Sequence, residues 1–149
     1  VTSLKHIDVE KTKTFKIMSK NVAIPGLSMI YLFLFRVSVS LLMLQHGWPK
    51  LMKFTNSEAI KFADPIGIGS NASLILAVFA EVVCSVLIII GFKTRLATIP
   101  LIITMLVVIF IVKLNDPIFE KESAILFLFS YGTIYVFGPG KYAADNKWK

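Results

Sequence analysis

Cysteine and histidine are scarce in this sequence, and their scarcity excludes several kinds of chemistry. Cys84 is the only cysteine, so the chain can form neither an internal disulfide nor a CxxC redox pair. The two histidines, His6 and His46, stand on either side of the first long apolar run, and so on opposite faces of any membrane that this run crosses. Bis-histidine haem ligation and a histidine-rich metal site are therefore excluded within one copy, and we expect no metal.

Glycine-based motifs for cofactors and nucleophiles are also missing. The sequence has no glycine-rich loop that would hold a phosphate, no GxSxG motif and no dinucleotide fingerprint. Any redox chemistry would need a partner protein or a lipid-soluble cofactor such as a quinone, because we expect no covalently bound cofactor.

Charged residues make up only 17% of the 149 residues, against about 25% in soluble domains, while 56% are hydrophobic. The apolar residues are concentrated in four runs, each near the roughly 20 residues that cross a bilayer as a helix. We place these predicted spans at about 27–46, 72–92, 96–113 and 123–138. The sequence thus predicts an all-α, polytopic membrane protein, a four-helix bundle in contact with lipid over residues 27–138.

Proline and glycine mark the ends of these runs. Gly47, Trp48 and Pro49 follow the first run, and Gly91 closes the second, which leaves a tight turn and predicts an antiparallel hairpin. The first run is longer than the apolar region of a signal peptide, contains Arg36 and lacks a small-x-small cleavage site. We therefore expect it to stay in the mature chain.

Lysine and arginine are distributed unevenly between the two sides of the predicted membrane. Ten lie in residues 1–26, the turn at 93–95 and the tail at 139–149, against five in the other connections. The positive-inside rule then predicts that both termini are cytoplasmic. We expect the membrane to be a bacterial inner membrane. This topology explains the excess of basic residues, so we expect no nucleic-acid partner. Residues 1–26 form either a basic helix lying on the membrane surface or a solvated tail.

Arg36 and Glu81 are lone ionisable groups near the centres of the first and second runs. An unpaired charge inside a bilayer is expensive, so we expect Arg36 to donate a two-pronged contact to Glu81. Thr104, Ser130 and Tyr131 lie at about the same predicted depth and would complete this polar layer. The layer either fixes the packing of the helices or forms a site that binds a ligand or handles protons.

A second group of polar residues is predicted at the outer interface. His46 and Lys50 are four residues apart and share one face if the helix continues past Gly47. Lys113 and Glu122 lie at about the same depth. Histidine changes protonation near neutral pH, so His46 either exchanges protons there or is an ordinary capping residue. The loop at 55–71, with a short helix expected from Ser57 to Phe62, is either a lid or a plain connector.

Several motifs resemble those of the DoxX family of small four-helix membrane proteins. Arg36 followed by His46, Gly47, Lys50 and Leu51 is similar to the family's arginine and HGxxKL stretch. Glu81, Gly91, Thr94 and Arg95 resemble its glutamate, closing glycine and TR turn. The fourth run begins with Glu122 and Ala124, and its ending at Gly138, Pro139, Gly140, Tyr142 and Asp145 resembles the family's GPG-x-(aromatic)-x-x-D. The resemblance covers about residues 27–145.

The resemblance implies a role beside membrane oxidoreductases. In one hypothesis the chain is an accessory or quinone-handling subunit of a redox complex, with Arg36, Glu81, His46, Lys50, Tyr131 and Glu122 as candidate ligand or proton-site residues. In the other it is a non-catalytic scaffold or assembly subunit whose polar core, including Thr104 and Ser130, only locks the helices. Small residues such as Ser40 and Ser85 would also allow close packing in a homo-oligomer, which a carrier role would require.

Overall fold

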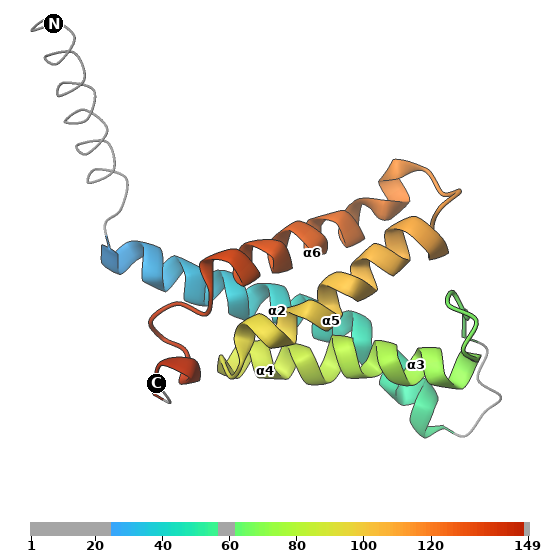
Figure 1. Ribbon diagram of the computed structural model, residues 1–149, viewed down its shortest axis with the longest axis horizontal. Helices are drawn as coiled ribbons and strands as arrows, with labels where there is room; N and C mark the ends of the chain where they lie inside the picture. Colours follow the sequence, from blue (N-terminus) through green and yellow to red (C-terminus); the bar gives the residue numbers. More distant parts are fainter. Residues whose placement is uncertain (1–24, 57–61, 148–149) are drawn as a thin grey trace, which may run out of the picture.

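The computed structural model describes residues 25–56 and 62–147, and all regular structure within them is helical (Figure 1). The all-α class is thus confirmed. The helices are α2 (Pro25–Thr55), α3 (Ser70–Val78), α4 (Ser85–Ile90), α5 (Thr94–Val107) and α6 (Ile118–Phe137), with π-helical segments η1 (Phe79–Cys84) and η2 (Val108–Val112) and a short turn η3 (Ala144–Asn146). Most of the predicted N-terminal segment and of the helix predicted at Ser57 lies outside the described residues.

Three helical stretches are long and apolar enough to cross a membrane. They are Gly26–Thr55 (30 residues), Ser70–Ile90 (21 residues) and Thr94–Val112 (19 residues). The last predicted span corresponds to α6, which has 20 residues and so a length of about 30 Å. Its first two turns carry Glu120, Lys121 and Glu122, so its apolar part is shorter than that of the other three. Three of the predicted spans are therefore supported by both length and composition.

Helix α2 is longer than the sequence predicts. It continues through Gly47, Trp48 and Pro49 to Thr55, although the first span was expected to end at His46. Pro49 removes one backbone N–H but does not end the helix, because its fixed φ is compatible with helical backbone. The extension adds more than two turns and carries Lys50 along the helix surface.

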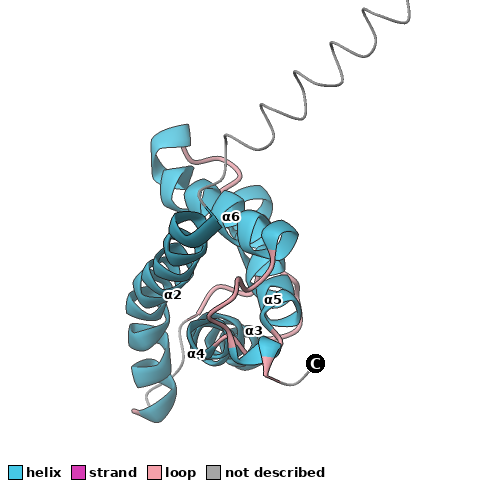
Figure 2. Ribbon diagram, turned by 90° about the vertical axis from the view of Figure 1, so that its left-hand side faces the viewer, coloured by secondary structure: helices cyan, strands magenta, loops and turns pink. Residues whose placement is uncertain are grey.

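The chain folds back on itself in consecutive helices. Helix α2 packs along α3, η1 and α4, while α5 packs along α6 and against η1 (Figure 1). Figure 2 shows α2 and α5 on opposite sides of the molecule, with α6 passing over both. At the end where α3 begins, α5 and α6 separate from α3, and at the other end the C-terminal tail returns to the turn between α4 and α5.

The buried core is small for a chain this apolar. It comprises Val39, Met43, Cys84, Ile88, Ala97, Leu101, Met105, Ile109, Ala124, Tyr131 and Ile134. Many large apolar side chains remain outside, including Leu27, Phe110 and Phe129, which are 62%, 61% and 71% exposed. Water disfavours so much apolar surface, whereas lipid accepts it, so the exposed surface agrees with a membrane environment.

Gly91 ends α4 in the left-handed conformation, with φ of 80°. The Gly91 N–H bonds to Ile88 O at 3.1 Å and the Phe92 N–H to Leu87 O at 3.0 Å, which is the Schellman pattern. A Cβ on Gly91 would lie 2.7 Å from both Arg36 Nη1 and Ala143 Cβ. The position therefore needs glycine both for its backbone and for its space.

Replacing Gly91 with alanine should lower the thermal stability of the purified protein in detergent. The left-handed backbone alone costs an L-residue about 1–2 kcal/mol, and the close contacts add to this. Gly26→Ala is the control, because a Cβ there meets nothing within 4 Å, and its melting temperature should stay the same or rise slightly. Equal effects of the two substitutions would contradict this account of the turn.

Candidate functional site

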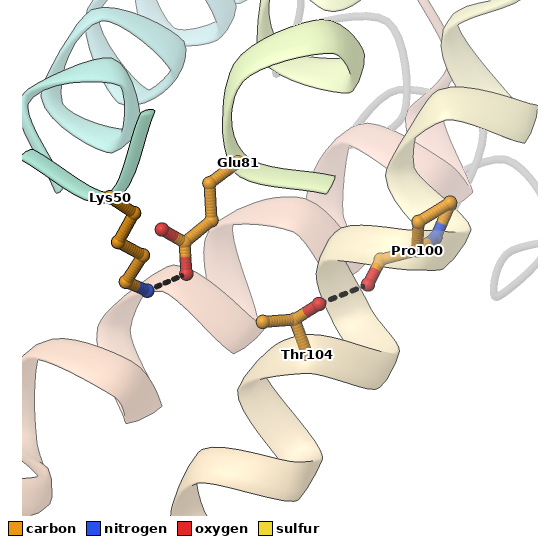
Figure 3. A network of polar contacts seen from close by, with 4 residues as sticks. All are labelled: Lys50, Glu81, Pro100 and Thr104. Carbon is orange, nitrogen blue, oxygen red and sulfur yellow. Dashed lines mark hydrogen bonds and ion pairs between the residues drawn. The ribbon is translucent and has the colours of Figure 1, made fainter. Parts of the chain in front are cut away.

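Glu81 is paired with Lys50. The Nζ atom of Lys50 lies 2.5 Å from Oε1 of Glu81, whose side chain is 2% exposed, against 27% for Lys50 (Figure 3). Arg36 is also buried, as expected, but it makes no ion pair with Glu81. The predicted Arg36–Glu81 contact is therefore wrong.

The length of α2 explains why the cation is Lys50. Arg36 reaches the carbonyl of Ile89, eight residues after Glu81 and so about 12 Å further along that helical stretch. Because α2 continues past Pro49, its next basic side chain on this face, Lys50, arrives at the level of Glu81. His46 and Lys50 share that face, as predicted for a continuous helix.

Gly47 allows α2 to approach the Glu81 backbone closely. A Cβ at Gly47 would lie 2.9 Å from Cγ2 of Val82 and 3.0 Å from Cβ of Glu81. Glu81 itself belongs to the π-helical segment η1. Such wide turns are rare and occur often at functional sites, because they redirect side chains out of the regular helical pattern.

An apolar pocket of about 520 Å³ opens beside the ion pair. Its walls come from α3, η1, α5 and η2 and include Leu76, Ala77, Phe79, Ile103, Val107 and Val112. Lys50 and Glu81 supply charge to this mostly apolar surface, which Ser73 and Thr104 also line. Phe62 and Ile66 of the loop before α3 also line it, and the ammonium of Lys50 lies 5.9 Å from the centre of the Phe62 ring.

A smaller polar pocket of about 230 Å³ lies on the other side of the same pair. It is lined by His46, Lys50, Glu81, Lys113 and Ser123, together with apolar residues. The His46 ring meets the ring of Phe127 edge to face, with centroids 5.5 Å apart. The ion pair thus forms part of the wall of both pockets.

Among the described residues, the second carboxylate oxygen of Glu81 has no hydrogen-bond partner. Oε2 is buried, whereas Oε1 accepts from Lys50. Leaving a charged acceptor buried and unsatisfied costs at least about 1–3 kcal/mol, so such an atom calls for a donor beyond those that residues 25–56 and 62–147 supply. The donor would be a water molecule or a ligand in one of the two pockets.

Arg36 serves the opposite end of the molecule. Its Nη1 donates to Pro139 O at 2.8 Å, and its Nη2 lies 3.4 Å from Ile89 O and 3.5 Å from Tyr142 O. The guanidinium also stands 5.5 Å from the centre of the Phe33 ring. These acceptors join α2, the end of α4 and the C-terminal tail, so Arg36 acts as a structural tie here.

Asp145 completes this tie by capping α5. Its carboxylate accepts from the backbone N–H of Lys93 at 2.5 Å and of Thr94 at 3.0 Å, while its own N–H donates to Gly91 O at 2.9 Å. Burial raises the pKa of Asp145, but these hydrogen bonds and the nearby charge of Arg36 outweigh it and hold the pKa below its ordinary value. Asp145 stabilises the α4–α5 turn in its ionised form.

The predicted layer of hydroxyl groups does not form around the ion pair. Thr104 donates to Pro100 O at 2.8 Å (Figure 3) and Ser130 to Leu126 O at 2.7 Å, each within its own helix. Tyr131 is fully buried, with its hydroxyl beside those of Ser85 and Ser40, and it lines neither pocket described above. Local bonds one turn back satisfy threonine and serine without any second helix.

The two remaining residues predicted at the outer interface, Lys113 and Glu122, differ in their positions. Glu122 is exposed and lines neither pocket, whereas Lys113 lines the polar pocket while its Nζ donates to Glu120 O. Within residues 25–56 and 62–147, no group of three or more His, Cys, Asp or Glu side chains is placed to hold a metal ion. Of the predicted site residues, the fold brings His46, Lys50 and Glu81 together at the polar pocket, and Thr104 lines the apolar pocket with Lys50 and Glu81.

Gly47, Phe62 and Asp145 contribute to these sites and were not among the predicted site residues. The sequence does not show what a buried glycine such as Gly47 packs against. Phe62 could not be predicted because its position depends on the conformation of the loop before α3. Asp145 follows a Gly-Pro-Gly segment that signals a turn, and a lone acid after such a turn could have indicated a cap.

Substituting Lys50 with methionine should destabilise the protein by about 3 kcal/mol, because it leaves Glu81 buried without a cation. We expect the low end of the range for buried pairs, since Lys50 is 27% exposed. Adding Glu81→Gln should recover most of the loss, as measured by thermal unfolding in detergent. Lys53→Met changes an exposed lysine on the same helix and is the control. Equal losses of stability in Lys53→Met and Lys50→Met would argue against the pair.

Replacing Asp145 with alanine should destabilise the protein by about 1 kcal/mol, the usual value of a helix cap. Because its folded-state pKa is depressed, the stabilisation is fully present above the unfolded pKa of about 3.9 and is lost as pH falls through the folded-state value. The difference in melting temperature between wild type and Asp145→Ala should therefore shrink below about pH 4. Asp116→Ala, at the opposite end of the helices, should melt at the wild-type temperature at every pH. A difference in melting temperature between wild type and Asp145→Ala that persists below about pH 4 would refute the assignment.

Comparison with known proteins identifies the family. Residues 31–114, more than half of the chain, match DoxX. No curated protein and no solved structure matches. The matched region contains Arg36, Lys50, Glu81 and Gly91, while Asp145 lies beyond it. With this match and three stretches that are long and apolar enough to cross a bilayer, the chain is a membrane protein of the DoxX family.

Proposed function

We propose that this protein binds a lipid-soluble quinone in the apolar pocket, as an accessory subunit of a membrane oxidoreductase complex. The observation that carries the proposal is the unsatisfied Oε2 atom of Glu81, buried beside Lys50 in the wall of a 520 Å³ apolar pocket. Small-molecule sites are typically concave, mostly apolar and about 300–1,000 Å³, with a few polar groups that orient the ligand.

The chemistry of the pocket fits a quinone. Its apolar walls suit an isoprenoid chain, and it lies between helices whose outer surfaces are exposed and apolar, so a ligand can be exchanged with lipid. Lys50 can donate to a carbonyl oxygen, and Glu81 Oε2 can accept from a hydroxyl, so the pair matches both the oxidised and the reduced headgroup. A bound quinone would supply two-electron, two-proton redox chemistry.

The chain's own residues would position the ligand and handle protons. Lys50 holds the carboxylate of Glu81 in position through the ion pair at its Oε1 atom. The polar pocket on the other side of the pair leads to His46 and Lys113, so a proton taken up at Glu81 has a polar route toward the surface. Arg36, Tyr131 and Glu122 stand apart from this route, and we assign them no part in binding.

We further propose that the protein lies in a bacterial inner membrane with both termini in the cytoplasm. The excess of lysine and arginine on that side, ten against five, supports this orientation. The His46 end of α2 and the polar pocket would then face the outer side.

A non-catalytic scaffold is the second candidate function, and Arg36 favours it. Its hydrogen bonds to the described residues go to backbone carbonyls, so this buried arginine ties helices together. In a scaffold the Lys50–Glu81 pair would have the same purpose, and a Lys50→Met/Glu81→Gln double variant would keep full activity of the complex. In a quinone-binding subunit that double variant would fold and lose the ligand.

Filling the apolar pocket should abolish quinone binding without disturbing the ion pair. Ala77→Phe projects into the pocket and should weaken binding of a short-chain quinone at least tenfold, which corresponds to about 1.4 kcal/mol. Ile75→Phe, on the same helix but exposed and outside the pocket, should bind like wild type. Equilibrium dialysis of the detergent-solubilised proteins measures both.

Purification from native membranes in mild detergent provides an independent check. Mass spectrometry of the lipid extract should find a quinone in wild type and much less in Ala77→Phe, together with co-purifying redox subunits. A wild-type sample free of quinone that also fails to bind the added compound would eliminate the ligand proposal and favour the scaffold.

A further inference from the structure

A second pocket, far from the ion pair, lies where α5 begins and α6 ends. It has a volume of about 970 Å³. One part of its lining is apolar and consists of Met29, Leu32, Phe92, Leu96 and Phe137, and the other part carries three cations, Lys93, Arg95 and Lys141. We call it the basic pocket. Lys93 and Arg95 lie where the membrane-length stretch Ser70–Ile90 ends and Thr94–Val112 begins, the level at which lipid headgroups are found.

Two of these cations have no polar partner among the described residues. Within the described part of the chain, the side chains of Arg95 and Lys141 make no hydrogen bond or ion pair, and both are exposed. The lysines at the opposite end of α5 and α6 behave differently, because Lys113 donates to Glu120 O and Lys121 to Leu114 O at 2.9 Å. The basic pocket therefore contains cations that are available to a ligand, whereas the lysines at the opposite end already donate to backbone carbonyls.

Asp145, the acid that lines this pocket, does not neutralise these cations by contact. Its two carboxylate oxygens accept from the backbone N–H groups of Lys93 and Thr94. The ammonium of Lys93 lies 5.8 Å from the centre of the Phe92 ring. A group of positive charge thus remains open to an external anion.

The backbone holds the cationic side of the pocket in shape. Gly138 has φ of 80°, and a Cβ there would lie 3.2 Å from Nη2 of Arg95, so the guanidinium packs over this glycine. Asn146 Nδ2 donates to Gly140 O at 2.7 Å and to Lys141 O at 2.9 Å, which fixes the segment that carries Lys141. Arg95 and Lys141 are therefore presented from an ordered framework.

We infer that the basic pocket binds the phosphate of an anionic phospholipid, with Arg95 and Lys141 on the headgroup and the apolar side against an acyl chain. Guanidinium groups pair with phosphate through two parallel hydrogen bonds, and ammonium groups act as point charges. The apolar wall favours a lipid over a water-soluble phosphate, which would leave that wall in water. This site is separate from the Lys50–Glu81 pair and does not depend on quinone binding.

The test is native mass spectrometry of the full chain in detergent, with phosphatidylglycerol and phosphatidylcholine added in equal amounts. Wild type should retain phosphatidylglycerol preferentially. Arg95→Gln and Lys141→Gln should each reduce that preference about fivefold, the effect expected for one basic residue beside an anionic lipid surface. Lys53→Gln removes one exposed cation at the other end of α2 and should leave the preference unchanged.

A conservative variant and a soluble competitor make the test specific for a lipid site. Arg95→Lys should keep most of the preference, and all variants should melt near the wild-type temperature, which distinguishes lost charge from lost fold. Glycerol 3-phosphate has the headgroup chemistry without the chains and should not displace the lipid. Equal retention of both lipids by wild type, equal effects of Lys53→Gln and Arg95→Gln, or displacement by glycerol 3-phosphate would each overturn the assignment.

Discussion

A carboxylate enclosed by apolar helices must have a cation, and in this protein the need of Glu81 for Lys50 constrains much of the surrounding structure. Helix α2 has to remain helical past Pro49 to bring Lys50 to the right level. It also has to approach η1 closely, which Gly47 permits. Because Lys50 satisfies one carboxylate oxygen only, the same arrangement leaves a buried acceptor between an apolar and a polar pocket.

The sequence predicted which charged groups would be buried, because an ionisable residue inside a long apolar run has few other places to go. It could not predict their partners. Arg36 and Glu81 lie at similar positions in their runs, but depth along a run is a poor guide when one helix extends beyond its apolar part and the other contains a π-helical turn. Proline after glycine and tryptophan suggested an end to α2, and tertiary contact with η1 outweighed that local signal.

The hydroxyl residues illustrate a second limit. Thr104 and Ser130 were expected to join a layer across helices, yet both bond to the carbonyl four residues earlier. That option exists in every helix and needs no neighbour, so polarity at a common depth does not imply contact. The turns were easier to predict, since Gly91 and the Gly138–Gly140 segment require backbone conformations that few other residues adopt.

The two ends of the molecule are held very differently. At one end, Arg36 and Asp145 fasten the tail to α2 and to the α4–α5 turn, while at the other end α5 and α6 diverge from α3. Both π-helical segments, η1 and η2, border the apolar pocket at this divergent end. Wide turns accommodate a one-residue shift in hydrogen bonding more easily than regular helix does. With one end fastened and the wide turns near the other, any opening of the bundle would be confined to the halves of the helices that surround the apolar pocket.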